Sequence, residues 1–199
     1  MNYIKQLREL EKLGKNIKLA AEAWDKEWQT LISTIMSART KDEVTIPTAK
    51  RLFSRYKTIG ALAKANLKDI EKIIKPVNFY KNKAKNILNS AKILTKEHKN
   101  KIPGDIELLI KLPGVGRKTA NVFLSELGKA AIGVDTHVSY ISQKLGWAKS
   151  KIPHKIEEEL KSLFPKRLWK ELNPILVRFG KTHTSKKKKD EHLNKIKNS

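Results

Sequence analysis

Two short stretches of the sequence combine side chains that can carry out covalent chemistry. Residues 112–121 read LPGVGRKTAN, and residues 133–138 read GVDTHV. Lys118 falls in the first turn of an expected helix beside Arg117, and both the positive end of the helix dipole and the neighbouring guanidinium disfavour an ammonium. We therefore expect a lowered pKa and a nucleophilic amine at Lys118. Asp135 supplies a carboxylate that can cap the next helix or stabilise a developing positive charge, and the two roles are compatible.

The residues in front of this lysine have the composition of a phosphate-binding turn. Leu112 to Gly116 connects two expected helices, Ile106 to Lys111 and Lys118 to Leu127. Gly114 and Gly116 allow a positive φ and a close approach of the backbone to a ligand. The amides at the start of the second helix can then bind phosphate oxygens. An ordinary tight turn is the alternative for Leu-Pro-Gly alone, but the basic residues that follow and the downstream Asp favour the phosphate-binding interpretation.

The net charge indicates a polyanionic partner. The 199 residues carry a formal charge of +23, and so much like charge on a small protein repels itself unless it meets phosphates. The excess is not confined to one end, because residues 181–199 contribute only seven Lys against Asp190 and Glu191. Nucleic acid is the expected partner. A ribosomal or chromatin protein could have the same balance, so charge alone does not indicate an enzyme.

Cysteine is absent, which excludes disulfides, thiolate metal sites and a cysteine-ligated iron–sulfur cluster. The most apolar stretches, such as Leu31 to Met36 and Val122 to Leu127, are far shorter than the roughly 20 residues that span a bilayer. The N-terminus has the spacing of an amphipathic helix and not of a signal peptide. We therefore expect no membrane partner and an intracellular protein, cytoplasmic or nucleoid-associated.

Apolar residues recur at helical spacing along most of the chain, which predicts an all-α fold. Asp105 is expected to cap the start of a helix, and Gly128 is expected to follow the end of one. Pro47 is expected to open a helix and Gly60 to lie in a turn. From Lys181 onward the pattern fades, which favours a mobile tail or a short terminal helix.

The stretches around Lys118 and Asp135 resemble the signature of the endonuclease III family of DNA glycosylases and abasic-site lyases. In that family a helix-hairpin-helix motif ends in a Lys, and an Asp follows a short loop later. The likeness covers roughly residues 25 to 180. It implies the helix-hairpin-helix DNA glycosylase fold, with two helical domains and a DNA-binding cleft between them. A six-helix barrel would span 20–129 and contain the motif at about 106–127, and residues 1–19 and 130–199 would form the second domain. Lys118 and Asp135 would meet at the cleft.

The resemblance also implies contacts with DNA. Residues 36–42, MSARTKD, are similar to a family stretch on the DNA-facing side, with Arg39 in place of a Gln that reaches into the gap left by an extruded nucleotide. Phe79 matches the apolar wedge of the family, although simple core packing is the alternative. His137 is better explained as a buried histidine bonded to the backbone than as a catalytic residue. The implied DNA-contacting residues are Arg39, Phe79, Leu112, Gly114, Val115, Gly116, Arg117, Thr119, His137, Lys186 and Lys187.

The sequence departs from the family near its end. Thr184 stands at the position of the first cluster cysteine, so the [4Fe–4S] cluster of the family is not expected, and no cofactor or metal is expected in its place. We expect the run Lys186 to Lys189 to act as a looser, unstructured electrostatic substitute. Apolar packing would then hold the second domain rigid. The residues expected to do this are Leu160, Leu163, Phe164, Leu168, Trp169, Leu172, Ile175 and Leu176.

These observations predict a monomeric, bifunctional DNA glycosylase and abasic-site lyase of base excision repair. Its partner would be double-stranded DNA with damaged bases or abasic sites, and it would remove oxidised pyrimidines through a Schiff base on Lys118 and β-elimination. One alternative keeps the lyase but changes the base to 8-oxoguanine or a mismatched uracil or thymine. Another is a helix-hairpin-helix DNA-binding protein without catalysis, which would leave the match at Asp135 unexplained.

Overall fold

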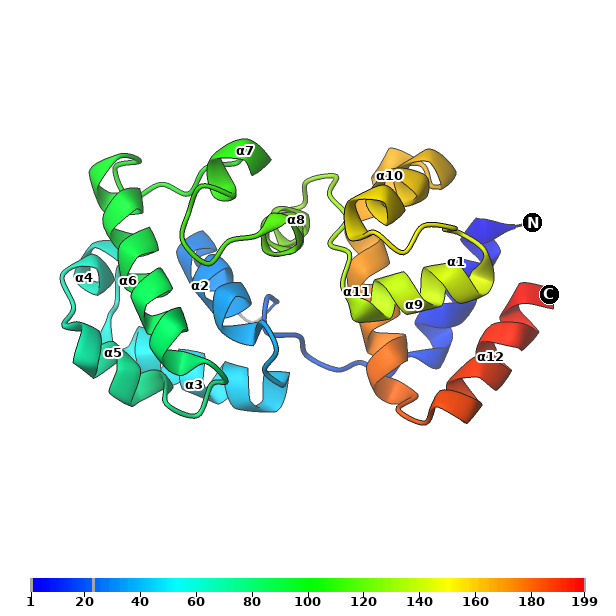
Figure 1. Cartoon of the computed structure of the whole chain (residues 1–199), viewed down its shortest axis with the longest axis horizontal. Helices are drawn as coiled ribbons and strands as arrows, with labels where there is room; N and C mark the ends of the chain where they lie inside the picture. The colour runs from blue at the N-terminus through cyan, green and yellow to red at the C-terminus, as the bar shows by residue number, and fades with distance from the viewer. Residues whose placement is uncertain (1, 23, 199) are drawn as a thin grey trace. The chain divides into compact units, whose positions relative to one another are not determined.

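The computed structural model describes residues 2–22 and 24–198, and within them the expectation of an all-α fold is confirmed (Figure 1). These residues form α-helices and one short 3-10 helix and no strand. The helices are α1 (Tyr3–Leu13), α2 (Glu27–Ser37), α3 (Asp42–Arg55), α4 (Ile59–Ala63), α5 (Leu67–Ile74), α6 (Tyr80–Lys96), α7 (Ile106–Leu109), α8 (Arg117–Glu126), α9 (Thr136–Leu145), α10 (Pro153–Leu163), η1 (Lys166–Leu168), α11 (Trp169–Thr182) and α12 (Lys186–Asn198). None of them is long and apolar enough to cross a bilayer.

The chain divides into two compact units, each described here by itself. One unit is continuous and comprises residues 18–127. The other joins residues 1–17 to residues 128–199. The first unit therefore holds α2 to α8, and the second holds α1 together with α9 to α12.

In the unit of residues 18–127, α2 packs against α3, α6 and α8. Its core residues Leu31, Ile32 and Met36 have no exposed surface, which explains why a helix with a weak N-terminal cap is stable there. Aromatic rings pack at the edge of this core: Trp28 contacts Phe53 edge to face, with the ring centroids 5.0 Å apart. The result is a packed support for the loops that precede α3, α6 and α8.

Two expectations about helix boundaries in this unit were wrong. Pro47 lies inside α3 and does not open it. A proline removes one N–H, which here would have bonded to the carbonyl of Glu43, and the Pro47 ring is exposed, so the helix continues. Gly60 is the second residue of α4 because Thr58 caps the helix by accepting a hydrogen bond from the amide of Ala61 at 3.0 Å.

In the second unit, α11 packs against both α1 and α9. The apolar residues expected to hold this unit together lie in its core, with Leu163 and Trp169 partly buried at the edge, so that expectation is confirmed. Trp147 also fills this core and packs edge to face on Phe164 at 4.9 Å. Its indole N–H donates to the side chain of Gln6 on α1 at 2.8 Å, which satisfies a buried polar atom.

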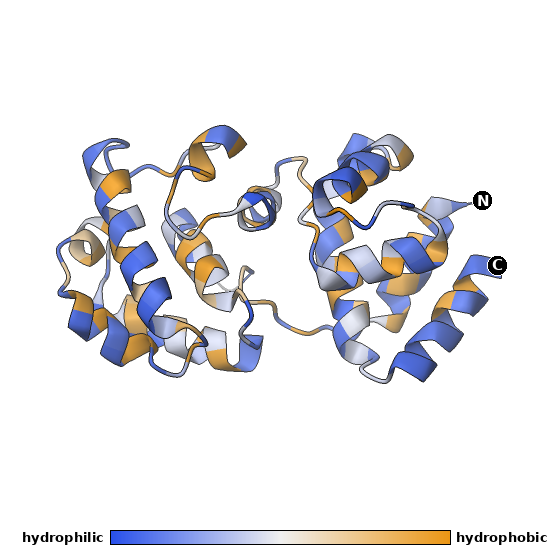
Figure 2. Cartoon of the chain, viewed as in Figure 1, coloured by the Kyte–Doolittle hydropathy of each residue, from blue (hydrophilic) through white to orange (hydrophobic). Residues whose placement is uncertain are grey.

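The lysine-rich end of the chain is a helix, which is one of the two forms expected from Lys181 onward, so the expectation that Lys186 to Lys189 are unstructured was wrong. Figure 2 shows α12 as largely hydrophilic with a few hydrophobic positions, and two of these, Leu193 and Ile196, are buried at 1% and 5% exposure. Gln6 donates to the carbonyl of Ile196 at 3.2 Å, which ties α12 to α1. Burial of this narrow apolar stripe outweighs the polar composition of the helix.

Candidate active site and DNA-binding surface

The hairpin between α7 and α8 has the tight turn expected from its glycines. Gly114 has φ of 82°, a conformation that L side chains rarely adopt. A Cβ atom at this position would also lie 3.0 Å from Cβ of Asn86 on α6. On the same helix, Ser90 donates to the carbonyl of Pro113 at 2.8 Å. Asp105 caps α7 by accepting from the amides of Glu107 and Leu108, as expected. The loop is therefore held against α6 at Pro113 and Gly114, and the helix before it is capped.

The side chains of the hairpin divide into buried anchors and an exposed rim. Leu112, Val115 and Thr119 are buried at 2%, 4% and 8% exposure, so these three implied DNA contacts could reach a phosphate only through the backbone. Gly116 and Arg117 are exposed. Gly116 is the N-cap of α8 and no side chain caps that helix end, so its first-turn amides are positioned as phosphate donors.

Lys118 is the second residue of α8, and it is exposed. It therefore occupies the first turn of a helix, next to Arg117, as the sequence predicted. The position places a primary amine directly beside the backbone donors of the hairpin. An amine held there can reach a sugar whose flanking phosphate is bound by those donors.

Asp135 belongs to the other unit, where it caps α9. Its Oδ1 accepts from the amide of Val138 at 2.9 Å, so the expected capping role is confirmed. The loop before it is also fixed, because Asn173 on α11 donates to the carbonyl of Gly133 at 2.6 Å. The carboxylate is half-buried and held in one orientation, which is what electrostatic stabilisation of a cation requires.

His137 is half-buried and lies against the backbone of α11. A Cβ atom built on Gly180 would lie 2.8 Å from Cγ and 3.0 Å from Cε1 of the ring, and closer still to Nδ1. Contacts this short do not occur between real atoms, so the ring occupies space that only a glycine leaves open. The tight packing against α11 favours a positioning role for His137 within the loop of Asp135.

Arg39 and Phe79 lie together on the surface of the unit of residues 18–127. Phe79 is 60% exposed, so the core-packing alternative is wrong for this residue. The guanidinium carbon of Arg39 lies 5.9 Å from the centroid of the Phe79 ring. Asn78 joins the two loops, since its side chain donates to the carbonyl of Arg39 at 2.6 Å and its amide donates to Thr40 Oγ1 at 3.2 Å.

The sequence did not single out Lys83, which lies beneath these loops. Its side chain is on α6 and only 7% of the residue is exposed. The ammonium donates to the carbonyls of Met36 at 2.7 Å and Ala38 at 2.5 Å, and to Thr40 Oγ1 at 3.1 Å. Burial lowers the pKa of Lys83 to about 8. The available sequence signal was its place on the apolar stripe of α6, four residues before the buried Ile87.

The N-terminal turn of α12 presents Lys186 and Lys187 to solvent. It is tied to α9 through Asp190, which accepts hydrogen bonds from Tyr140 and, at 3.2 Å, from Lys144. Desolvation and the hydrogen bond to Asp190 raise the pKa of Tyr140 to about 12, so this phenol stays a donor at neutral pH. The basic residues are therefore carried on an anchored helix with a defined register.

The side chains after α11 do not fit an iron–sulfur cluster. The chain has no cysteine to supply thiolates. His183 and His192 pack ring against ring at 4.5 Å in this segment, and in residues 2–22 and 24–198 there is no group of three His, Cys, Asp or Glu that could hold a metal ion.

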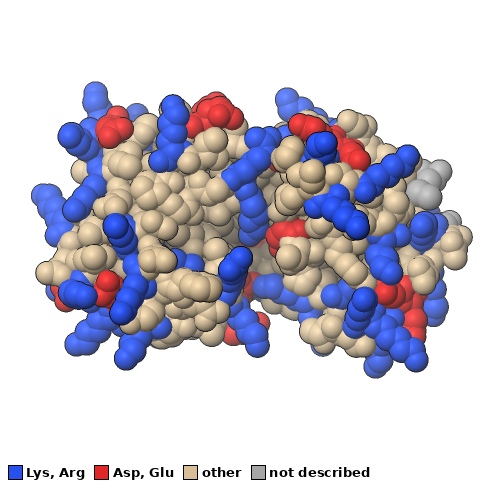
Figure 3. Space-filling model, in the orientation of Figure 1, with Lys and Arg blue, Asp and Glu red and all other residues tan. Residues whose placement is uncertain are grey.

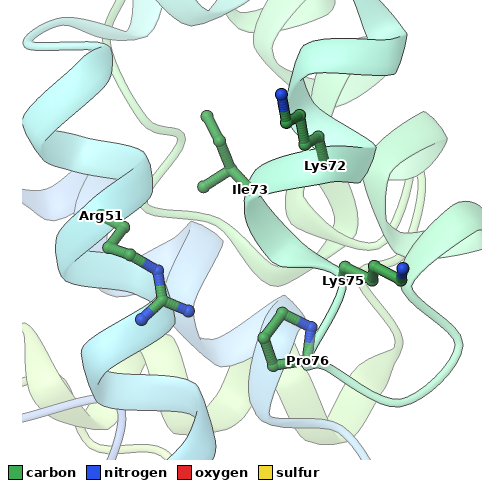
Figure 4. A pocket seen from close by; sticks show the side chains of 5 residues that line it. All are labelled: Arg51, Lys72, Ile73, Lys75 and Pro76. Atoms are coloured by element: carbon green, nitrogen blue, oxygen red, sulfur yellow. The ribbon is translucent and has the colours of Figure 1, made fainter.

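Basic side chains outnumber acidic ones across the face seen in Figure 3. One hollow on this basic protein lies between α3 and α5 and is lined by Arg51, Lys72, Ile73, Lys75 and Pro76 (Figure 4). Arg51 extends toward Pro76, whereas the Lys75 ammonium is directed away from it. These cations do not converge, and none of the candidate catalytic residues lines the hollow.

Comparison with known proteins agrees with this class of helix-hairpin-helix DNA-acting protein. The profile of the "HhH-GPD superfamily base excision DNA repair protein" family matches residues 32–166. Endonuclease III of Thermotoga maritima is 44% identical over 155 residues, covering 77% of this chain and 73% of the relative. Endonuclease III of Synechocystis is 38% identical over 155 residues, covering 77% and 71%. A trapped covalent intermediate of an endonuclease III with DNA matches with a TM-score of 0.84 at 32% identity, covering 92% of this chain and 86% of that one.

The chain belongs to the endonuclease III family of base excision DNA repair proteins. It acts on DNA, and its enzymatic class is that of a DNA glycosylase with abasic-site lyase activity. The resemblance deduced from the sequence is therefore confirmed.

Proposed function

We propose that Lys118 is the nucleophile of this enzyme and that it forms the covalent link to DNA. The observation that carries this proposal is an exposed lysine in the first turn of α8, two residues after Gly116 of the hairpin. The unprotonated Nζ attacks C1′ of an extruded nucleotide and the C1′–N bond to the base breaks. The departing base takes the proton that Nζ gives up, so it leaves as the neutral base. Ring opening gives the imine between Nζ and C1′. Loss of a proton from C2′ then expels the 3′ phosphate by β-elimination.

Asp135 is proposed as the carboxylate that stabilises the cationic sugar during this attack. Its fixed orientation as the cap of α9 supports the assignment, because a preorganised anion needs no reorganisation as positive charge develops. The backbone amides of the exposed residues Gly116 and Arg117 are proposed to hold the flanking phosphate. Lys186 and Lys187 would add contacts to the phosphate backbone from α12.

The proposed substrate is double-stranded DNA that contains an oxidised pyrimidine or an abasic site. This base is the one that the resemblance to the endonuclease III family implies, and 8-oxoguanine or a mismatched uracil or thymine is the alternative. Arg39 and Phe79 are proposed to fill the gap in the stack when the damaged nucleotide is extruded, since an extruding enzyme must replace the lost stacking. The exposure of Phe79 supports this role.

The proposed enzyme works as a monomer inside the cell, without a metal or another cofactor. The chemistry above needs an amine and a carboxylate from the chain itself, which supports a cofactor-free reaction. Apart from Leu108 and Ile110, which lie together at the end of α7, the exposed large apolar side chains of the described residues lie on different elements, which supports a monomer. They are Ile4, Phe79, Leu108, Ile110 and Ile152.

The test is borohydride trapping on duplex DNA that contains a single thymine glycol. Borohydride reduces the imine to a stable amine, so wild-type protein is expected to give a covalent adduct and Lys118→Ala none. Lys96→Ala, an exposed lysine at the end of α6, is the matched control and is expected to trap like wild type. An adduct on an abasic-site duplex but not on thymine glycol would refute the base assignment. An adduct that persists in Lys118→Ala would refute the proposed nucleophile.

A further inference from the structure

Lys83 connects two loops that are far apart in the sequence. It lies in the first turn of α6, four residues after Phe79, and all three of its acceptors belong to residues 36–40. An ammonium has three N–H donors, and here each has an oxygen to bond to. A buried lysine that satisfies all its donors on one loop acts as a fixed support for that loop.

Both residues at the tips of these loops have an unusual backbone. Arg39 has φ of 54° and Phe79 has φ of 58°. Residues other than glycine rarely occupy this left-handed region, and they remain there only when the surrounding structure holds them. Neither tip is held by burial, because both side chains are exposed. The hydrogen bonds beneath them must therefore supply the constraint.

The bonds of Lys83 and Asn78 account for this constraint. Lys83 holds the carbonyls on the N-terminal side of Arg39 and the hydroxyl of Thr40 on its C-terminal side. Asn78, directly before Phe79, holds the carbonyl of Arg39 itself. The two tips are thereby fixed relative to each other, with the guanidinium over the aromatic ring.

We propose that Lys83 is a positioning residue that makes Arg39 and Phe79 a single rigid wedge for opening the DNA stack. This inference rests on the proposed function of Arg39 and Phe79 as the residues that fill the gap. A wedge that is preorganised enters the duplex without first ordering two loops, so extrusion of the nucleotide is faster. The chemical step at Lys118 does not depend on the wedge once the nucleotide is already out of the stack.

The experiment separates an effect on nucleotide extrusion from an effect on the chemical step. Single-stranded DNA with an abasic site needs no extrusion, whereas the same site in a duplex does. Single-turnover strand cleavage is measured on both substrates with wild type, Lys83→Met and Lys85→Met. Lys85 is an exposed lysine on the same helix and serves as the charge-matched control. Lys83→Met is expected to lose at least tenfold in rate on the duplex and less than twofold on the single strand, while Lys85→Met changes neither selectively.

A second variant covers the case in which Lys83→Met does not fold. Asn78 is exposed, so Asn78→Ala removes the tie to Arg39 without creating a core cavity, and it is expected to show the same duplex-selective loss. Equal losses on both substrates would overturn the proposal, as would a loss confined to the single strand or no loss. Failure of the proposed chemistry is separate, because wild type would then form no borohydride adduct on either substrate. Failure of the proposed gap-filling role is separate too, because Phe79→Ala would then cleave the duplex at the wild-type rate.

Discussion

The contact between His137 and Gly180 predicts how Gly180→Ala changes the stability of the protein, because helix propensity and steric overpacking act there in opposite directions. Gly180 lies inside α11, and replacement of a helical glycine by alanine ordinarily stabilises a protein by about 1 kcal/mol. Here the new Cβ would lie 2.8 Å from Cγ of His137. The Cγ atom is next to the helix backbone of α9, so the ring can escape only by changing its χ1 rotamer or by moving the helix. Overpacking of this kind costs about 1–3 kcal/mol.

The clash is expected to win in Gly180→Ala, with a net loss of about 1 kcal/mol and a fall in Tm of about 2–4 °C. In a His137→Ala background the ring is gone, so the same substitution is expected to stabilise the protein. The assay is a double-mutant cycle by chemical denaturation, with wild type, both single variants and the double variant. The expected coupling between the two sites is about 1–3 kcal/mol. If Gly180→Ala has the same effect with and without the imidazole, the steric argument is refuted.

Two further predictions concern lysines. Burial lowers the pKa of Lys83 from 10.5 to about 8, so between these pH values the folded state holds fewer protons than the unfolded state, and the buried ammonium destabilises the fold below pH 8. This cost disappears as the pH rises to 10.5, so the free energy of unfolding of wild type should rise by about 3 kcal/mol relative to Lys83→Met between pH 7 and 11. Chemical denaturation over this range measures the difference, and parallel curves for the two proteins would contradict the prediction. Lys186→Ala and Lys187→Ala should each reduce the slope of log affinity against log salt for duplex DNA by about 0.9. The controls are Lys195→Ala and Lys197→Ala, exposed on the last turns of α12, which should leave the slope unchanged. Equal slopes in all four variants would show that the start of α12 does not contact DNA.

Local signals in the sequence predicted the hairpin and its surroundings well. Asp105 and Asp135 cap helices because a short carboxylate can reach amides two or three residues ahead, whatever the rest of the fold does. Gly114 and Gly128 have positive φ for a similarly local reason. The first-turn position of Lys118 follows from these boundaries. Motifs of this kind are short-range, so a single sequence reveals them.

What the sequence could not reveal depends on partners distant in the chain. Lys83 looks like one of 43 basic residues, and only its three acceptors in residues 36–40 make it a buried support. The helix α12 looks like a charged tail because its apolar stripe is narrow, and Leu193 and Ile196 are buried only where the second unit provides a surface. The role of each residue in the reaction could not be predicted from the residues alone, because a sequence pattern gives residue types and spacing but no positions in space.

The pairing of α1 with α12 determines the order in which the two units can form during synthesis. Residues 18–127 are continuous, so this unit has all its helices as soon as residue 127 has left the ribosome. Leu7 and Leu10 have no exposed surface in the folded protein, but α11 and α12, against which α1 packs, are made after the whole of residues 18–127. At translation rates of about 5–20 residues per second, α1 waits roughly 10–40 s with its apolar face uncovered. The nascent chain thus carries a completed hairpin for some time before α1 has α11 and α12 to pack against.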